Sequence, residues 1–307
     1  MTTEPVRYRS DEEDSARWIG FPFRQGDIVI STRSKSGTTW MQMICALLVF
    51  QTPELPAPLP ELSPWLDWLM VPRDEVFASL AAQKHRRFVK THTPLDGVPS
   101  DPRATYVVVA RHPLDMAVSL YHQGDNIDRA AVRAKVGMPP PDEPPAPRPP
   151  LREWLLAWID EDAGPRSEPG SIPGSELDSL PGVLWHVSDA WARREESNVR
   201  LVHYGALSQD LEREMRRLAA GFGIDVADDL WPSLVRAATF DRMRDHADLT
   251  APDPGGILKD RRAFFRSGVS GAGRAVLTDD EVAHYGERAS RLAPADLLAW
   301  LHAETFD

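Results

Sequence analysis

The stretch between residues 26 and 40 constrains the fold of this chain more than any other part of the sequence. It opens with Ile28–Ile30, a run of β-branched residues of the kind found in strands that are buried on both faces. Ser34–Gly37 follows, and serine and glycine are typical of tight turns. Gly37 also permits a left-handed φ or the close approach of a ligand to the backbone. This order predicts a buried strand that ends in a tight turn.

A helix is predicted directly after this turn. Thr38 and Thr39 can cap a helix that continues through the apolar residues 41–50. The first N–H groups of a helix have no partner within it, and Lys35 adds a positive charge to the turn. The strand, the turn and the helix start together predict a site for a phosphate or a similar anion.

Other interpretations of this loop compete with a specific anion site. A nucleotide triphosphatase loop has the pattern G-x-x-x-x-G-K-[ST], but here Lys35 precedes Gly37 and no glycine opens the loop at the required spacing. A turn with a purely structural role is another interpretation, because serine, glycine and threonine are common before helices. The rest of the sequence is needed to distinguish between these interpretations of the loop.

The charge of the chain narrows the class of partner. The formal net charge is −11 over 307 residues, which argues against a nucleic-acid-binding protein because such proteins normally carry a basic surface. An acidic protein that binds a polyanion must place lysine and arginine in the site itself. Basic residues at strand ends are therefore informative in this sequence.

No feature of the sequence indicates a membrane or an oxidising compartment. Cys45 is the only cysteine, which excludes an intrachain disulfide and fits a reducing compartment. The polar residues 1–14 lack the apolar region of a signal peptide, and the apolar run 41–50 is too short to span a bilayer. We expect a soluble cytoplasmic protein that does not span a membrane.

Three more strands are predicted at residues 87–94, 105–111 and 199–204, with helical segments between them. Strands that alternate with helices indicate an α/β fold of three layers with a mostly parallel central sheet. Ligands of such sheets bind at the carboxyl ends of the strands. The residues expected at these ends are mostly basic or aromatic: Lys35, Lys90, His92, Arg111 and Tyr204. Their convergence predicts an anionic ligand of the nucleotide type.

The same edge of the sheet lacks the residues of a kinase. A P-loop kinase needs an aspartate at the end of a hydrophobic strand to hold Mg²⁺, whereas residues 107–109 are followed by Ala110 and Arg111. An arginine at this position can bind phosphate directly through its planar fork. Asp115, one turn later, is expected to orient Arg111. No group of residues has the spacing of a zinc site, so we expect no metal.

Taken together, these motifs resemble the cytosolic-type sulfotransferases that use 3′-phosphoadenosine 5′-phosphosulfate (PAPS). The loop Ser34–Trp40 is similar to the 5′-phosphosulfate-binding loop of that family, and the likeness extends to Gly268. Four other stretches resemble actinobacterial members, mycobacterial glycolipid sulfotransferases among them: residues 16–18, 63–67, 85–97 and 297–300. The resemblance implies a sandwich fold like that of the P-loop NTPases.

The resemblance also implies which residues hold PAPS. Those around the 5′-phosphosulfate are Lys35, Ser36, Gly37, Thr38 and Thr39. Those around the 3′-phosphate are Arg111, Ser119, Arg266, Ser267 and Gly268. Those around the adenine are Trp40, which stacks on it, and Tyr204, Thr239 and Phe240.

Lys90 and His92 match the catalytic lysine and histidine of the family. In sulfuryl transfer, charge develops on the sulfuryl oxygens and on the departing phosphate oxygen, and positioned cations stabilise it. The resemblance implies that Lys35 neutralises the leaving oxygen and that Lys90 neutralises the sulfuryl group. His92 would take the proton of the acceptor hydroxyl, since an imidazole with a pKa of about 6.5 suits a base at neutral pH.

Some features of the family are missing. Ser267 stands where the family has a lysine, and Gly271-Ala272-Gly273 replaces a Gly-Asp-Trp motif. The family's dimer motif is not recognisable around residues 278–281, so the sequence predicts no oligomeric state.

The sequence thus predicts an enzyme that moves a sulfuryl group from PAPS to a hydroxyl of a small-molecule, aromatic or glycolipid acceptor and releases 3′,5′-ADP (PAP). We expect one domain over residues 1–307, with a flexible arm at 1–16 and a Pro/Gly-rich insert at 123–183 that covers the acceptor site. The alternatives are a P-loop-type nucleotide kinase and a catalytically inactive nucleotide-binding protein. Dependence on ATP and Mg²⁺ would identify the first, and binding without turnover would identify the second.

Overall fold

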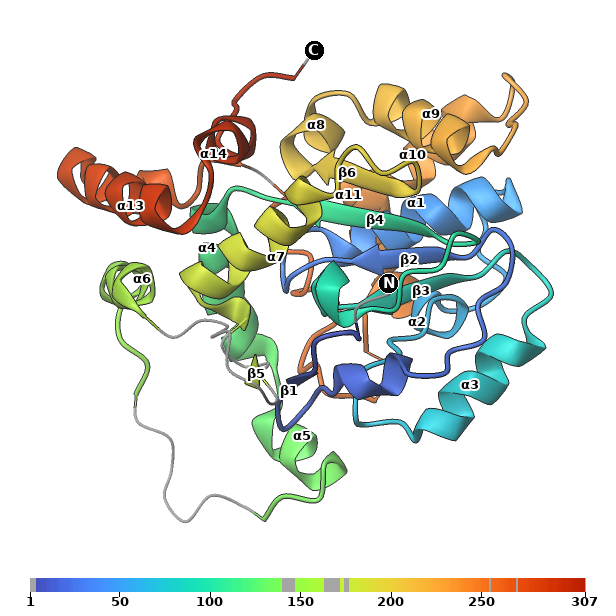
Figure 1. The fold of residues 1–307 in the computed structure, drawn as a ribbon, viewed down its shortest axis with the longest axis horizontal. Coiled ribbons are helices and arrows are strands. Elements are labelled where there is room, and N and C mark those ends of the chain that lie inside the picture. The colour runs from blue at the N-terminus through green and yellow to red at the C-terminus, as the bar shows by residue number, and fades with distance from the viewer. Residues whose placement is uncertain are drawn as a thin grey trace.

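A four-stranded parallel sheet forms the centre of the fold in the computed structural model (Figure 1). The structure describes residues 4–139, 147–162, 172–173, 177–253, 255–268 and 270–306. The Pro/Gly-rich insert predicted at 123–183 therefore lies partly outside the described residues. The order of the sheet is β3-β2-β4-β6, with β2 at Ile28–Ser31, β3 at Phe88–Thr91, β4 at Thr105–Ala110 and β6 at Val199–His203. The prediction of a mostly parallel sheet is confirmed.

The three later strands are shorter than predicted. The clearest case is β6, which ends at His203, because Tyr204 already begins helix α8 (Tyr204–Gln209). The side chain of His203 accepts a hydrogen bond from the N–H of Gly205 (2.9 Å) and so caps this helix. A second, two-stranded sheet pairs β1 (Tyr8–Arg9) with β5 (Ile172–Pro173).

The helices of the described residues have the following bounds: α1 (Thr38–Phe50), α2 (Leu59–Leu62), α3 (Arg73–Ala82), α4 (Pro113–Asn126), α5 (Arg129–Lys135), α6 (Leu151–Asp160), α7 (Leu180–Ala192), α8 (Tyr204–Gln209), α9 (Leu211–Phe222), α10 (Trp231–Ala237), α11 (Phe240–Asp245), α12 (Ala247–Thr250), α13 (Asp279–Leu292) and α14 (Ala295–Leu301).

Alternate residues of each central strand face opposite layers, as the period of a strand requires. Ile28 and Ile30 pack with helices α1, α9 and α10 in one hydrophobic cluster. Val29, between them, packs on the other face with Trp18 and with Leu80 of α3. A further cluster joins α4, α6, α7, α13 and α14. Figure 1 shows the sheet between these helices, and the three-layer prediction is confirmed.

The start of α1 corrects the sequence prediction. Thr38 and Thr39 are its first residues and not its caps, because the N-cap is Gly37 and no side chain caps the helix. The hydroxyl of Thr38 is instead hydrogen-bonded to that of Thr32. The first N–H groups of α1 therefore make no hydrogen bond to a side chain of the capping residue.

Residues 4–16, part of the segment predicted as an arm, make specific contacts with the rest of the chain. Tyr8 is 2% exposed, and its hydroxyl donates to the carboxylate of Asp96 (2.9 Å). Arg7 forms a two-pronged ion pair with Asp14. The polar composition of this segment gave no sign of the Tyr8 contact, because Asp96 lies 88 residues further along the chain.

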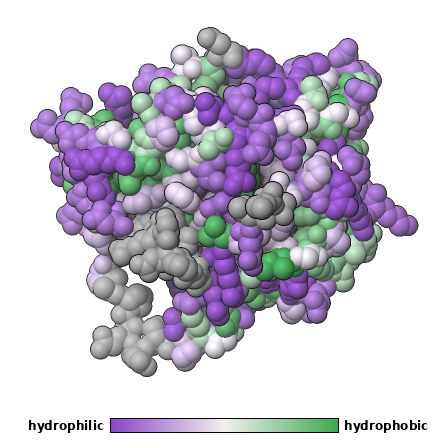
Figure 2. All heavy atoms as spheres, in the orientation of Figure 1, coloured by the Kyte–Doolittle hydropathy of each residue, from purple (hydrophilic) through white to green (hydrophobic). Residues whose placement is uncertain are grey.

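Hydrophobic side chains on the visible surface are scattered. On the face shown in Figure 2, apart from the grey atoms, they form small patches between hydrophilic residues. Within the described ranges, no helix is both long and apolar enough to cross a membrane.

Candidate functional site

The loop between β2 and α1 lies where the chain reverses its direction across the sheet. β3 pairs with β2 on one side, and β4, which comes later in the chain, pairs with it on the other. The connections to these two strands therefore run in opposite directions across the sheet, and the carboxyl end of β2 lies at the crevice between them. A cavity of about 810 Å³ opens there, and residues at the ends of all four central strands line it. This is the edge at which the sequence predicted an anion site.

Lys35 lies inside this loop in a left-handed conformation, with φ of +61°. Its Nζ donates to Oε1 of Gln123 (3.1 Å) and lies 3.8 Å from the centre of the Phe264 ring. Both partners are uncharged, so the positive charge remains available to an anion. Burial, reinforced by nearby basic side chains of which Arg111 is the strongest, lowers the pKa of Lys35 to about 7.

Gly37 is the residue that lets this loop pass close to its neighbours. Its φ is +110°, which disfavours other residues, and a Cβ there would lie 3.0 Å from Tyr204 and 3.3 Å from Val109. A larger residue would therefore strain the loop and displace Tyr204 from the cavity wall.

The residues predicted for the 3′-phosphate all line this cavity. Arg111, directly after β4, donates to the carbonyl oxygen of Lys35 (3.3 Å), and its guanidinium lies 4.4 Å from the centre of the Tyr204 ring. Ser119, on α4, lines the same cavity. Arg266, Ser267 and Gly268 line it from the C-terminal part of the chain.

Aromatic rings from three helices form one wall of this cavity. Trp40 of α1 lies edge to face with Tyr204 of α8, with 5.1 Å between ring centres. Its indole N–H donates to the carbonyl oxygen of Ala238 (2.8 Å), which fixes the ring. Phe240, the first residue of α11, lines the cavity as well, and a Cβ on Gly268 would lie 2.7 Å from it. The glycine thus permits the chain to pack against Phe240.

Two predicted contacts are not supported by the structure, because Ser36 and Thr239 do not line the cavity. Ser36 is buried, and its N–H donates to the carbonyl oxygen of Arg33 (3.2 Å) within the turn. The hydroxyl of Thr239 donates to the carbonyl oxygen of Arg236 (2.8 Å). The backbone of Ser36 and the side chain of Thr239 thus bond to nearby backbone groups.

Asp115 has a different partner from the one predicted. Its carboxylate accepts hydrogen bonds from the N–H groups of Gly271 and Gly273, both at 2.8 Å. A Cβ on Gly273 would lie 2.4 Å from that of Leu114, so only glycine fits against α4 there. The glycines that replace the family's Gly-Asp-Trp motif thus have a packing role: they dock the C-terminal segment onto the start of α4.

Lys90, on β3, is held beside an aromatic pair that also lines the cavity. Its Nζ lies 3.8 Å from the centre of the Trp65 ring, and Trp65 stacks on Trp68 with 5.1 Å between centres. Both indoles line the cavity. Burial lowers the pKa of Lys90 to about 8, although the carboxylate of Glu13 raises it.

His92 follows β3, and the structure indicates which of its nitrogens can act as a base. Nδ1 is hydrogen-bonded to the carbonyl oxygen of Thr32. A carbonyl oxygen only accepts, so Nδ1 carries the hydrogen and the neutral ring has its lone pair on Nε2. Burial, together with the charges of Lys90 and Arg33, holds the pKa of His92 well below its usual value. The ring is therefore neutral at pH 7 and able to accept a proton.

Some residues of the site were not predicted from the sequence. Arg33 donates to the carbonyl oxygen of His92 and pairs with Asp178 (2.7 Å). These contacts join parts of the chain that are distant in sequence, so no local pattern reveals them. Gln123 could have been found, because it lies four residues after Ser119 and hence on the same face of α4.

This chain is similar to known proteins both in sequence and in fold. Residues 25–289 match the family model described as "Sulfotransferase domain". A glycolipid sulfotransferase of Mycobacterium bovis is 41% identical, over 98% of this chain and 95% of its own length. The structure of mouse sulfotransferase SULT7A1 complexed with PAP is 20% identical and has a TM-score of 0.63 over 94% of each chain. That of retinol dehydratase with androsterone and the inactive cofactor PAP is 19% identical, with a TM-score of 0.64 over 95% of this chain and 86% of its own.

Proposed function

Because this chain belongs to the family of sulfotransferase domains, we propose that it transfers a sulfuryl group from PAPS to a hydroxyl of a small-molecule or glycolipid acceptor and releases PAP. The observation that carries this proposal is a set of basic side chains that face one cavity at the carboxyl edge of the sheet: Lys35, Lys90, Arg111 and Arg266. In a protein with a net charge of −11, such a set favours a strongly anionic ligand.

The residues around the cavity suit each part of PAPS. The loop that leads from Lys35 into α1 offers a helix N-terminus to the 5′-phosphosulfate. Arg111 and Arg266 offer planar guanidinium groups to the 3′-phosphate. Trp40 and Phe240 offer aromatic surface to the adenine.

The same residues account for the transfer step. PAPS supplies the sulfuryl group, and PAP is the leaving group. Lys35 neutralises the phosphate oxygen that departs, and Lys90 neutralises the sulfuryl oxygens. Nε2 of His92 takes the proton of the acceptor hydroxyl while its oxygen bonds to sulfur and the bond from sulfur to PAP breaks. Arg33 holds the backbone of His92, so the base stays in place.

The acceptor is proposed from the relative and from the lining of the cavity. The M. bovis relative is named for glycolipids. The cavity combines apolar residues such as Ile127 and Ile257 with acidic residues such as Glu13 and Asp178. Such a lining suits a molecule that has an apolar and a hydroxylated part. We place the reaction in the cytoplasm, which the buried free thiol of Cys45 supports.

PAP is expected to bind more weakly as the pH rises above 7. The pKa of Lys35 is about 7 in the free protein, and a bound phosphate raises it because the phosphate stabilises the charged form. Below pH 7 Lys35 is already protonated, whereas above it the amine must take up a proton on binding. The affinity then falls by up to about tenfold per pH unit for this one proton. Calorimetry in two buffers of different ionisation enthalpy measures both the affinity and the proton uptake.

Lys35→Arg is the matched control for this experiment. Arginine keeps the charge and does not titrate in this range, so the variant is expected to bind PAP with little pH dependence near pH 7. Absence of PAP binding in the unmodified protein, or tight binding of ATP only in the presence of Mg²⁺, contradicts the proposed function.

A further inference from the structure

A segment outside the central sheet lies beside β3, the strand that carries Lys90. Residues 64–69 run between β3 and the N-terminal segment. On one side, the N–H of Lys90 donates to the carbonyl oxygen of Pro64 (3.0 Å). On the other side, the N–H of Leu69 donates to the carbonyl oxygen of Glu12 (2.8 Å). The N-terminal segment is thus tied by backbone hydrogen bonds to the strand that carries Lys90.

Four side chains follow one another across these hydrogen-bonded segments. Bridge pairing sets Trp65 beside Lys90, and it sets Glu13 beside Trp68. The two indoles stack on each other, and all four residues line the cavity. The four side chains therefore form a row that runs from Lys90 through Trp65 and Trp68 to Glu13. Glu13 therefore lies in the part of the cavity that holds Lys90.

A tight turn holds the backbone of Glu13 in place. Its carbonyl oxygen accepts from the N–H of Ser10 (2.8 Å), and its own N–H donates to the hydroxyl oxygen of Ser10 (3.0 Å). The same hydroxyl oxygen accepts from the N–H of Glu12 (3.2 Å). These bonds fix the backbone position without using the carboxyl group.

The carboxyl of Glu13 has no hydrogen bond or ion pair within the part of the chain that the structure describes. Neighbouring carboxylates in the cavity differ in this respect. Asp178 pairs with Arg33 at 2.7 Å, and Glu12 lies 3.8 Å from Arg129. An acidic side chain that lines a cavity without a protein partner is available to a ligand.

We propose that Glu13 selects the acceptor by binding a second hydroxyl of the molecule whose first hydroxyl reacts at His92. This favours a polyhydroxylated acceptor, a sugar or polyol head group, over a molecule with a single hydroxyl. The inference rests on the proposed function, because Lys90 and His92 define which hydroxyl reacts.

The surroundings of Glu13 suit a hydroxyl better than a cation. Burial raises the pKa of Glu13 to about 8; the charges of Arg33 and Lys90 oppose this rise, and those of Asp67 and Asp178 add to it. The negative charge of bound PAPS raises the pKa further. At pH 7 the carboxyl is therefore mostly neutral, and it can both donate to a hydroxyl and accept from it.

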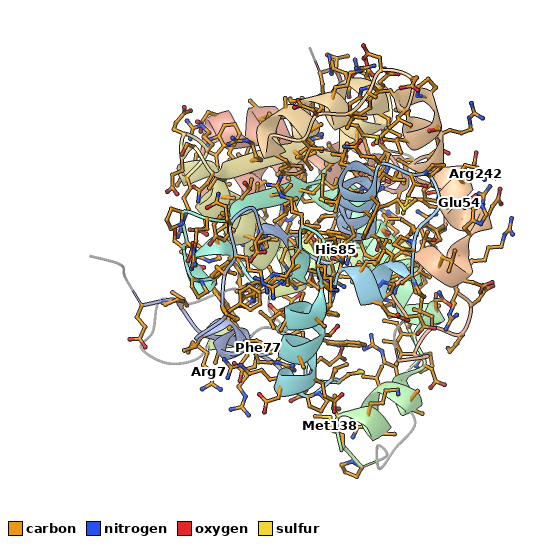
Figure 3. All side chains as sticks on the ribbon, turned by 90° about the vertical axis from the view of Figure 1, so that its right-hand side faces the viewer. Arg7, Glu54, Phe77, His85, Met138 and Arg242 are labelled. Atoms are coloured by element: carbon orange, nitrogen blue, oxygen red, sulfur yellow. The ribbon has the colours of Figure 1, made fainter. Side chains whose placement is uncertain are left out.

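The test compares octyl β-D-glucopyranoside with 1-octanol as acceptors, because the two share an alkyl tail and differ in the number of hydroxyls. Glu13→Ala is expected to lower the ratio of kcat/KM for the glucoside to that for octanol about tenfold, mainly through KM. Glu13→Gln is expected to keep most of the ratio, because the amide also donates and accepts. Glu54→Ala is the control: Glu54 is exposed, and Figure 3 shows it on the side away from Arg7 and the N-terminal segment.

An unchanged ratio in Glu13→Ala overturns the proposal. So does an equal loss for both acceptors in Glu13→Ala and Glu13→Gln, because that indicates a purely structural role, and so does a preference of the unmodified protein for octanol. Failure of the proposed function has a different signature: PAPS then yields no PAP with the glucoside, with octanol or with 2-naphthol.

Discussion

Replacement of His92 by asparagine is expected to lower kcat by about 10²–10⁴-fold, because the variant lacks a base for the acceptor hydroxyl. Asparagine can still donate to the carbonyl oxygen of Thr32, so the adjacent loop keeps its position. The affinity for PAP is expected to change little, since the proposed base faces the acceptor and not the nucleotide. PAP formation measures kcat, and calorimetry measures the affinity.

His246→Asn is the control for this prediction. His246 is exposed and does not line the cavity, so its replacement should leave turnover and PAP binding as they are. Turnover close to that of the unmodified protein in His92→Asn would remove His92 from the mechanism. A loss of PAP affinity as large as the loss of kcat would mean that the histidine supports the nucleotide site instead.

Lys90→Met is expected to lower kcat by about 10²–10³-fold, the usual effect of removing one positioned group that stabilises charge in the transition state. Methionine has a similar length and can still pack on Trp65, so the stacked indoles should stay in place. PAP has no sulfuryl group, and its affinity should therefore be nearly normal. The two measurements together separate a role in the transfer step from a role in nucleotide binding.

Lys84→Met serves as the matched control, because Lys84 is exposed and outside the cavity. It should behave as the unmodified protein does. If Lys90→Met kept its turnover, the charge on the sulfuryl group would have to be neutralised by another residue. If the variant lost PAP binding, Lys90 would belong to the nucleotide site.

The sheet and the loop after β2 could be predicted because their signals are local. The β-branched run at Ile28–Ile30 and the apolar run before Arg111 each mark a buried strand. Parallel strands place their carboxyl ends at one edge, so Lys35, Lys90, His92 and Arg111 were expected to meet without knowledge of any distance. The structure brings these residues to one cavity.

Helix starts were less predictable, because the signals there are ambiguous. Threonines before an apolar run are typical of caps, yet Thr38 and Thr39 lie inside α1, since Gly37 takes the cap position with φ of +110°. The start of α7 carries plainer signals, because Ser179 caps it and Pro181 stands in its first turn.

The remaining parts of the site depend on contacts between distant segments. Glu13 reaches the cavity only because residues 64–69 pair with the N-terminal segment, and Arg33 reaches His92 across two strand ends. Asp115 holds two glycines that lie more than 150 residues away in sequence. No periodic pattern or residue spacing in the sequence predicts such contacts.

The measurement that tests the central claim most directly is transfer from PAPS to octyl β-D-glucopyranoside by the purified protein, with EDTA present, followed by mass spectrometry of the glucoside and quantification of PAP. We expect a sulfate ester and PAP in equal amounts, and neither product in more than trace amounts with His92→Asn. Phosphate transfer from ATP that requires Mg²⁺, or PAP binding with no sulfate ester on any hydroxylated acceptor, would contradict the account.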